Sequence, residues 1–172
     1  MNWTELIKGS MEYNYATAQK LLDLVGDAEL GWKPSTGDNW MTMGQLAMHL
    51  TNACGAPCKG FVTGDWGMPA GAEPMAGDEM LPPAGKLPSV TGVAEAKRLL
   101  EQDKQLALAM LAQAGEDNLE NRIATAPWDQ MQMKLGVRLM QMVGHLTQHK
   151  GQLFYYLKLQ GKPVNTMHLW GM

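Results

Sequence analysis

The sequence predicts an all-α fold, a four-helix bundle with a long connection rich in proline and glycine between its second and third helices. Four segments repeat apolar residues at three- and four-residue steps, which is the period of an amphipathic helix. No segment alternates apolar and polar residues over a useful length, so strands are not needed. Four amphipathic helices of about 20 residues each are what such a bundle requires.

The first two helices are expected at about residues 4–25 and from about residue 42 onward. The second should begin at Thr42, because Thr42 and Gln45 have the spacing of a capping box, in which the hydroxyl and the amide satisfy free backbone N–H groups. In the first helix the residues that recur at three- and four-residue steps are Leu6, Ile7, Tyr13, Thr17, Leu21 and Leu24. The stripe of the second helix is Leu46, His49, Leu50 and Ala53.

The third and fourth helices are expected at about residues 91–114 and 134–160. The third is rich in residues with high helix propensity, and Gly115 fits its C-terminal end. Gly161 and Pro163 fit the end of the fourth. The apolar face of the fourth helix consists of Leu135, Leu139, Met142, Leu146, His149, Leu153 and Leu157.

Residues 55–92 form the connection between the second and third helices. They include eight glycines and six prolines, which predicts an irregular loop draped over one end of the bundle. A lid over a functional site is the alternative interpretation. The side chains expected to anchor the loop are Phe61, Trp66, Met75, Met80 and Leu81.

Length and composition restrict the class of protein. A chain of 172 residues suits one domain, which we expect to span residues 1–172. The net charge of −3 argues against nucleic acid as the main partner. The longest clean apolar stretch is far shorter than the roughly 20 residues of a membrane span, and the first residues lack a secretory signal. Two cysteines are too few for disulfide bonds to stabilise a domain of this size, so a reduced, cytoplasmic protein is expected.

The charges are unevenly spread along the chain. Residues 1–129 contain all 17 acidic side chains and carry −8, whereas the residues from Gln130 onward carry +5. This asymmetry fits a basic last helix that packs among acidic neighbours. The alternative is that these cations help to hold an anionic substrate.

Three histidines are expected to face the interior of the bundle. His145 and His149 lie four residues apart on the last helix, a spacing at which two imidazoles can bind one metal ion. His49 lies on the inward face of the second helix. A buried imidazole needs a hydrogen bond or a metal ion, and three of them on two helices favour a shared metal over separate hydrogen bonds.

Three imidazoles would fill three of the four positions around a tetrahedral divalent ion. The fourth position is then left for water or substrate, as in catalytic sites. Such an ion makes hydrolysis or activation of a thiol feasible. Zinc, nickel, copper and iron all accept imidazole ligands, so the ligand type does not choose among them.

Four other residues are weaker candidates for the chemistry. His168, in the C-terminal tail, is interpreted as a fourth ligand, an outer-shell residue or an exposed side chain. Asp103 lies on the apolar stripe of the third helix, so it is either a partner that orients a ligating histidine or a charge at the edge of the stripe. Cys54 and Cys58 are expected to be buried small residues outside the metal site, with a redox or thiol role as the alternative, and Pro57 is expected to break the helix before Cys58.

Two stretches resemble the DinB-like superfamily. The first is residues 144–153, GHLTQHKGQL, followed by residues 155–158, YYLK, and 161–163, GKP. The second is residues 32–34, WKP, followed by residues 40–50, WMTMGQLAMHL. The order of one histidine on the second helix and the pair on the last matches as well. The long connection at residues 55–92 departs from the family pattern, and no obvious acidic residue neighbours the histidine pair.

The resemblance implies a four-helix bundle with a divalent metal ion held by His49, His145 and His149, with zinc or nickel as the expected ion. It also implies a homodimer, a small-molecule substrate and a low-molecular-weight thiol as partner. The first hypothesis is therefore a metal-dependent transferase or hydrolase that uses metal-bound thiolate or water. The second is a non-catalytic dimeric protein, related to stress, that binds a metal or a small ligand. In a third, the histidines are only hydrogen-bonded in a plain core.

Overall fold

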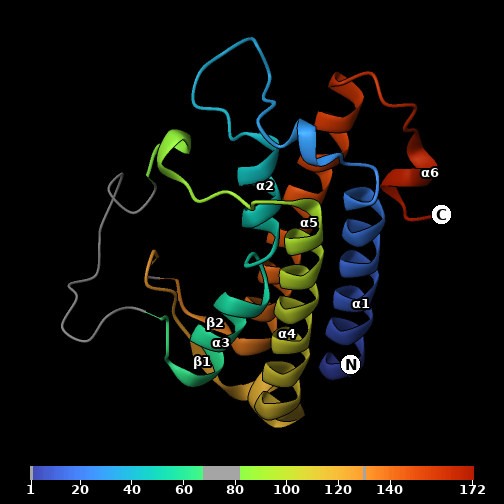
Figure 1. Ribbon diagram of the computed structural model, residues 1–172. Coiled ribbons are helices and arrows are strands. Elements are labelled where there is room, and N and C mark those ends of the chain that lie inside the picture. Colours follow the sequence, from blue (N-terminus) through green and yellow to red (C-terminus); the bar gives the residue numbers. More distant parts are fainter. Residues whose placement is uncertain (1, 68–81, 130) are drawn as a thin grey trace.

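The computed structural model describes residues 2–67, 82–129 and 131–172, and these residues are mainly helical (Figure 1). The all-α prediction is therefore confirmed. Three long helices lie side by side, with α1 in contact with both α4 and α5. The helices are α1 (Trp3–Leu22), α2 (Met43–Leu50), α3 (Gly55–Thr63), α4 (Val93–Asn121), α5 (Leu135–Leu159) and α6 (Thr166–Leu169), with 3-10 turns at Asp27–Glu29 and Ala84–Lys86.

The fourth rod of the bundle is divided into two short helices. α2 packs on α5, and α3 packs on both α4 and α5, so the two helices follow one another along the bundle (Figure 1). The prediction of an irregular loop from residue 55 onward was wrong for α3. Pro57 was expected to break the helix before Cys58, but it lies in the first turn of α3. Backbone N–H groups have no intrahelical partner in the first turn, so a proline there costs no hydrogen bond.

The helix termini follow local sequence signals closely. Asn2 caps α1 by accepting a hydrogen bond from the Glu5 amide at 3.1 Å. The predicted capping box of α2 is present: the Gln45 backbone N–H donates to Thr42 Oγ1 at 3.2 Å, and the Thr42 backbone N–H donates to Gln45 Oε1 at 2.8 Å. Gly115, the expected end of the third helix, does interrupt it: its φ of 71° and ψ of 158° are not helical, and a second helical segment of α4 follows this kink to Asn121.

A small hairpin joins α4 to α5. Its strands β1 (Ile123–Ala124) and β2 (Met133–Lys134) pair antiparallel, which corrects the expectation that no strand is present. Arg138 on α5 is 1% exposed and holds the hairpin connection. Its guanidinium donates to both carboxylate oxygens of Asp129 and to the carbonyl of Met131.

The basic C-terminal part of the chain packs against acidic partners, as the charge pattern predicts. Lys162 Nζ lies 2.7 Å from Glu29 Oε1, and Lys134 pairs with Glu120. Lys150 and Lys158 instead place their ammonium groups over aromatic rings, those of Tyr13 and Phe154. These basic side chains thus make contacts within the fold, either as ion pairs or over aromatic rings.

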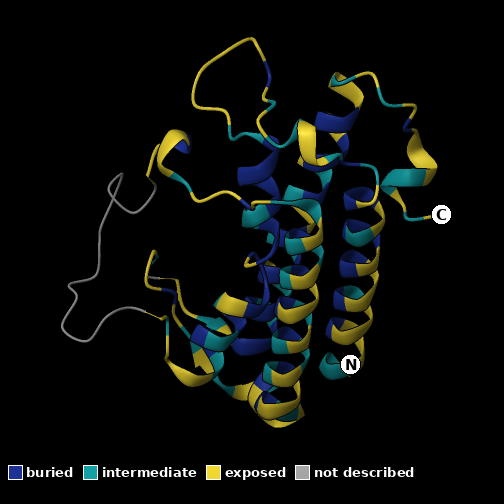
Figure 2. Cartoon of the chain, in the orientation of Figure 1, coloured by how far each residue is buried: buried dark blue, intermediate teal, exposed yellow. Residues whose placement is uncertain are grey.

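The core fills the space between the helices, whose buried sides face inward (Figure 2). Phe61 and Trp66, two of the expected loop anchors, pack edge to face with ring centroids 4.9 Å apart. Met75, Met80 and Leu81 lie outside the described residues, as does much of the segment interpreted as a lid. Within the described ranges, none of the helices combines the length and the hydropathy that crossing a membrane requires.

Candidate metal centre

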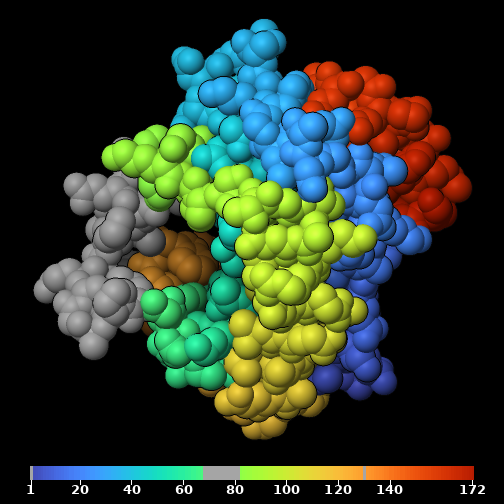
Figure 3. Space-filling model, viewed as in Figure 1, coloured from blue at the N-terminus to red at the C-terminus, as the bar shows by residue number. Residues whose placement is uncertain are grey.

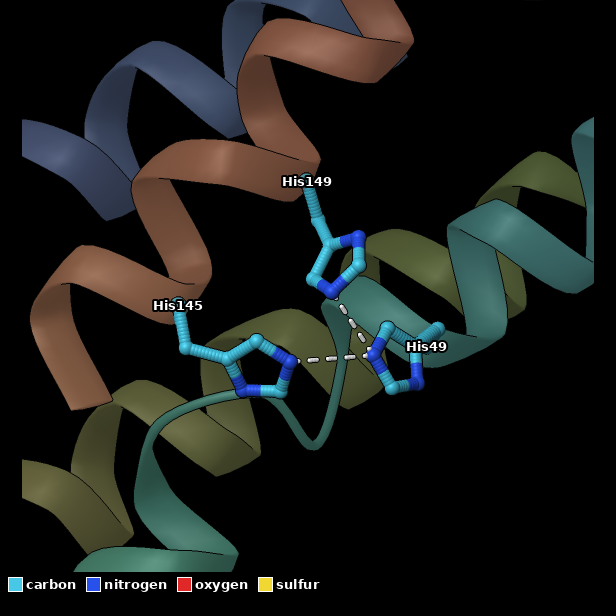
Figure 4. Close-up of side chains that lie close together, drawn as sticks. All are labelled: His49, His145 and His149. Carbon is cyan, nitrogen blue, oxygen red and sulfur yellow. Dashed lines mark hydrogen bonds between the residues drawn. The ribbon is translucent and has the colours of Figure 1, made fainter. Parts of the chain in front are cut away.

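Three imidazoles from two helices converge between α2 and α5 (Figure 4). His49 lies in the last turn of α2, and His145 and His149 lie one turn apart on α5. His49 Nε2 is 3.2 Å from His145 Nε2 and 2.9 Å from His149 Nε2. The convergence predicted from the two motifs is therefore present.

Helix register explains why these side chains meet. The capping box fixes where α2 begins, and His49 then falls on the side of α2 that packs on α5. On α5, residues four apart project from one face, so His145 and His149 point toward α2 together. All three side chains are partly buried.

The spacing of the nitrogens fits a divalent ion. Two imidazole nitrogens bound at about 2.0–2.1 Å to a tetrahedral zinc ion lie about 3.3 Å apart. The two Nε2 separations of 2.9 and 3.2 Å are near that value, and candidate ligand atoms of the three residues all lie within 4.8 Å of one another. The spacing of these nitrogens is therefore compatible with a shared divalent ion.

The hydrogen bonds behind the imidazoles fit metal binding as well. His145 Nδ1 lies 2.9 Å from the carbonyl oxygen of Ala53, which can only accept, so Nδ1 carries the proton and the neutral ring has a lone pair on Nε2. His149 Nδ1 lies 2.7 Å from Gln152 Oε1 and is assigned the same tautomer. Metal-binding histidines commonly donate their second ring N–H to such acceptors.

A metal-free cluster of this kind is poorly satisfied. The lone pairs of His145 and His149 both face His49 Nε2, and a single proton on that nitrogen cannot serve both contacts fully. Burial, followed by the proximity of His149 and His145, lowers the pKa of His49 to about 4. Burial also lowers the pKa of His149. Burial therefore favours the neutral form of His49 and His149, which is the form that binds metals.

The weaker candidates lie outside this cluster. His168 is in α6, where the Asn165 amide donates to its Nδ1 at 3.2 Å, and it is not part of the group of potential metal ligands found among the described residues. Cys54 and Cys58 are fully buried, as expected, with their sulfurs 4.0 Å apart. The hydrogen bond with Cys54, together with burial, raises the pKa of Cys58, which disfavours the reactive thiolate.

Asp103 is buried, but its carboxylate does not contact the three imidazoles as we expected of a direct partner. It accepts a hydrogen bond from the Tyr15 hydroxyl at 2.6 Å. It also accepts from the backbone amides at the start of α3, at 3.4 Å from Cys54, 3.0 Å from Gly55 and 3.0 Å from Ala56. Burial raises the pKa of Asp103 against the opposite effect of these hydrogen bonds.

The partners of the imidazole Nδ1 atoms were not predicted from the sequence. Gln152 lies three residues after His149, so helical spacing does contain a signal for that contact. The carbonyl of Ala53 is 92 residues from His145, and no local pattern links the two.

Comparison with known proteins agrees with this architecture. The sequence profile of the DinB superfamily matches residues 10–153, and the chain belongs to this superfamily. A crystal structure of a DinB-like protein from Bacillus cereus ATCC 10987 is similar in fold, with a TM-score of 0.68 and 19% sequence identity, covering 94% of this chain and 95% of the other. No curated protein sequence matches this chain.

Proposed function

We propose that this protein binds a divalent metal ion through His49, His145 and His149 and acts as a metal-dependent transferase or hydrolase. The observation that carries the proposal is the meeting of three imidazoles at one point, with the His145 Nδ1 directed at the Ala53 carbonyl. Three protein ligands leave a coordination position free for a small molecule, which is typical of catalytic rather than structural sites.

A bound ion would supply Lewis acidity, which lowers the pKa of a water molecule or a small thiol. The chain itself supplies the ligands and their orientation. Gln152 and the Ala53 carbonyl hold two rings by their Nδ1 atoms, and the side chain of Gln152 is exposed at the rim of the site. We propose zinc or nickel as the ion, because imidazole suits both.

Elemental analysis of the purified protein tests metal binding. Wild type should contain close to one equivalent of a divalent metal, and His149→Ala should lose it. His168→Ala is the matched control, because His168 lies outside the cluster. Equal trace amounts in all three proteins would overturn the proposal and leave only a hydrogen-bonded core.

A turnover assay tests the reaction class. We expect a metal-dependent rate with an electrophile and at least one member of a panel of low-molecular-weight thiols, or hydrolysis of an activated ester. The metal-free protein and His149→Ala should fall to the background rate. Tight metal binding without any turnover above background would reject catalysis on this panel and favour the non-catalytic metal-binding role.

The expected homodimer and cytoplasmic location stay predictions. Sedimentation equilibrium compares the mass in solution with the 18.9 kDa of one chain. A mass near twice that value is the expected result.

A further inference from the structure

One peptide group connects the buried carboxylate of Asp103 to the metal site. The amide of Cys54 and the carbonyl of Ala53 belong to the same planar peptide unit. The Cys54 N–H points to Asp103 Oδ2 at 3.4 Å, and the Ala53 oxygen accepts from His145 Nδ1 at 2.9 Å. A carboxylate and an imidazole thus act on the two ends of one peptide unit.

The carboxylate is firmly placed. Asp103 is 5% exposed, and its four hydrogen-bond partners all donate, which suits an ionised carboxylate. It occupies the N-terminal end of α3, where free amides and the helix dipole favour a negative charge. The Cys54 side chain at the N-cap position of α3 makes no capping hydrogen bond, so the Asp103 carboxylate takes that role.

The backbone at this point is shaped to approach Asp103. A Cβ atom on Gly55 would lie 2.2 Å from the Asp103 carbonyl oxygen and 2.6 Å from Asp103 Oδ1. Only a glycine therefore allows the start of α3 to lie this close to α4. Asp103 thus contacts the start of α3 through the backbone amides of Cys54, Gly55 and Ala56.

We propose that Asp103 is a positioning residue for the metal site, acting through the Ala53–Cys54 peptide unit on His145. It fixes the Ala53 carbonyl in place, and the carbonyl holds the His145 ring in the tautomer that leaves Nε2 free for the metal. The inference deepens the proposed function and rests on it, because it concerns the same three-histidine site. A contact through one peptide unit replaces the direct carboxylate–histidine contact found behind many metal ligands.

Nitrogen NMR of the imidazoles tests the link without any metal. In metal-free wild type we expect His145 to be protonated on Nδ1 and to show a slowly exchanging Nδ1–H signal. In Asp103→Asn that signal should shift and exchange faster, whereas the signals of His149, which bonds Gln152, should stay unchanged. Unchanged His145 signals in the folded variant would overturn the inference.

Metal affinity gives the second readout. Cobalt(II) serves as a coloured probe in a competition titration with a chelator. Asp103→Asn should bind it on the order of 10-fold more weakly than wild type, the lower end of the range for outer-shell partners. Leu100→Ala is the matched control: Leu100 is a buried residue one turn away on α4, so the variant loses stability but keeps every hydrogen bond of the Asp103 carboxylate.

The outcomes separate the two ideas. Failure of wild type to bind cobalt(II) would overturn the proposed function, while the NMR comparison would still decide the role of Asp103. Binding by wild type and Asp103→Asn with equal affinity, or an equal loss in Leu100→Ala, would overturn the inference alone. If Asp103→Asn does not fold, Tyr15→Phe serves instead, because it removes one donor to the carboxylate. It should shift the His145 signal and weaken cobalt(II) binding in the same direction, but by less.

Discussion

At the scale of single residues, the histidine cluster makes the protein sensitive to acid. The pKa of His49 is about 4 in the fold and about 6.5 in an unfolded chain. As pH falls from about 6.5 to about 4, the unfolded state therefore binds protons that the folded state does not. We expect the free energy of unfolding of the metal-free protein to decrease across this window and to be unaffected by these groups at higher pH.

Urea unfolding at a series of pH values measures this slope. His49→Gln should flatten it, because a neutral amide does not titrate. His168→Gln is the control and should keep the wild-type slope, since His168 lies outside the cluster. Identical slopes in wild type and His49→Gln would contradict the prediction.

A pair of glycines makes a second test at this scale. Gly55→Ala should destabilise the protein by about 1–3 kcal/mol, because its Cβ would clash with Asp103. Gly9→Ala, at an exposed position inside α1 with nothing within 4 Å of a Cβ, should stabilise it by about 0.5–1 kcal/mol. Thermal or urea unfolding measures both, and a gain in stability for Gly55→Ala would refute the close packing.

The sequence predicted the histidines but not their surroundings. His49, His145 and His149 lie on apolar helical faces, so their inward direction follows from the helical period alone. Asp103 was recognised as an inward carboxylate for the same reason. Its backbone partners at the start of α3 lie 47 to 49 residues away in the chain, and Tyr15 lies 88 residues away, so these contacts depend on how the helices pack, which no local pattern specifies.

At the scale of elements, Arg138 is the main tie between the hairpin and α5. Arg138→Met keeps the apolar stem but leaves the Met131 carbonyl and the Asp129 carboxylate without their donor. We expect a loss of about 2 kcal/mol or more in the free energy of unfolding, measured in urea. Lys134→Met, which breaks a more exposed ion pair, should cost less, and an equal loss in both would contradict the argument.

Helical periodicity predicted the long helices to within a few residues, because each buries one continuous apolar stripe. It missed α3, whose nine residues include two glycines and Pro57. Local propensity argues against a helix there. The amides at the start of α3 are stabilised by a carboxylate from another helix, so tertiary contacts override the propensity.

At the scale of the whole molecule, the three histidines of the proposed metal site come from two helices, α2 and α5, so a bound ion would link them. A ligand that binds only the folded state stabilises it by mass action, by about 2.7 kcal/mol at a free concentration 100 times its Kd. We therefore expect chelation to lower Tm by about 5–10 °C for a chain of this size. Calorimetry of metal-loaded and chelated protein checks this. His149→Ala should show no difference between the two conditions, and an equal shift there would point to metal binding elsewhere.

Pro57 has a consequence that reaches beyond its own turn. It lies at the third position of α3, directly after the residues whose backbone amides donate to Asp103. The proline ring fixes φ, so it restricts the conformations open to this helix start before the chain folds. A rigid ring close to the Ala53–Cys54 peptide unit thus limits how the turn can rearrange, and Pro57→Ala would remove that restriction.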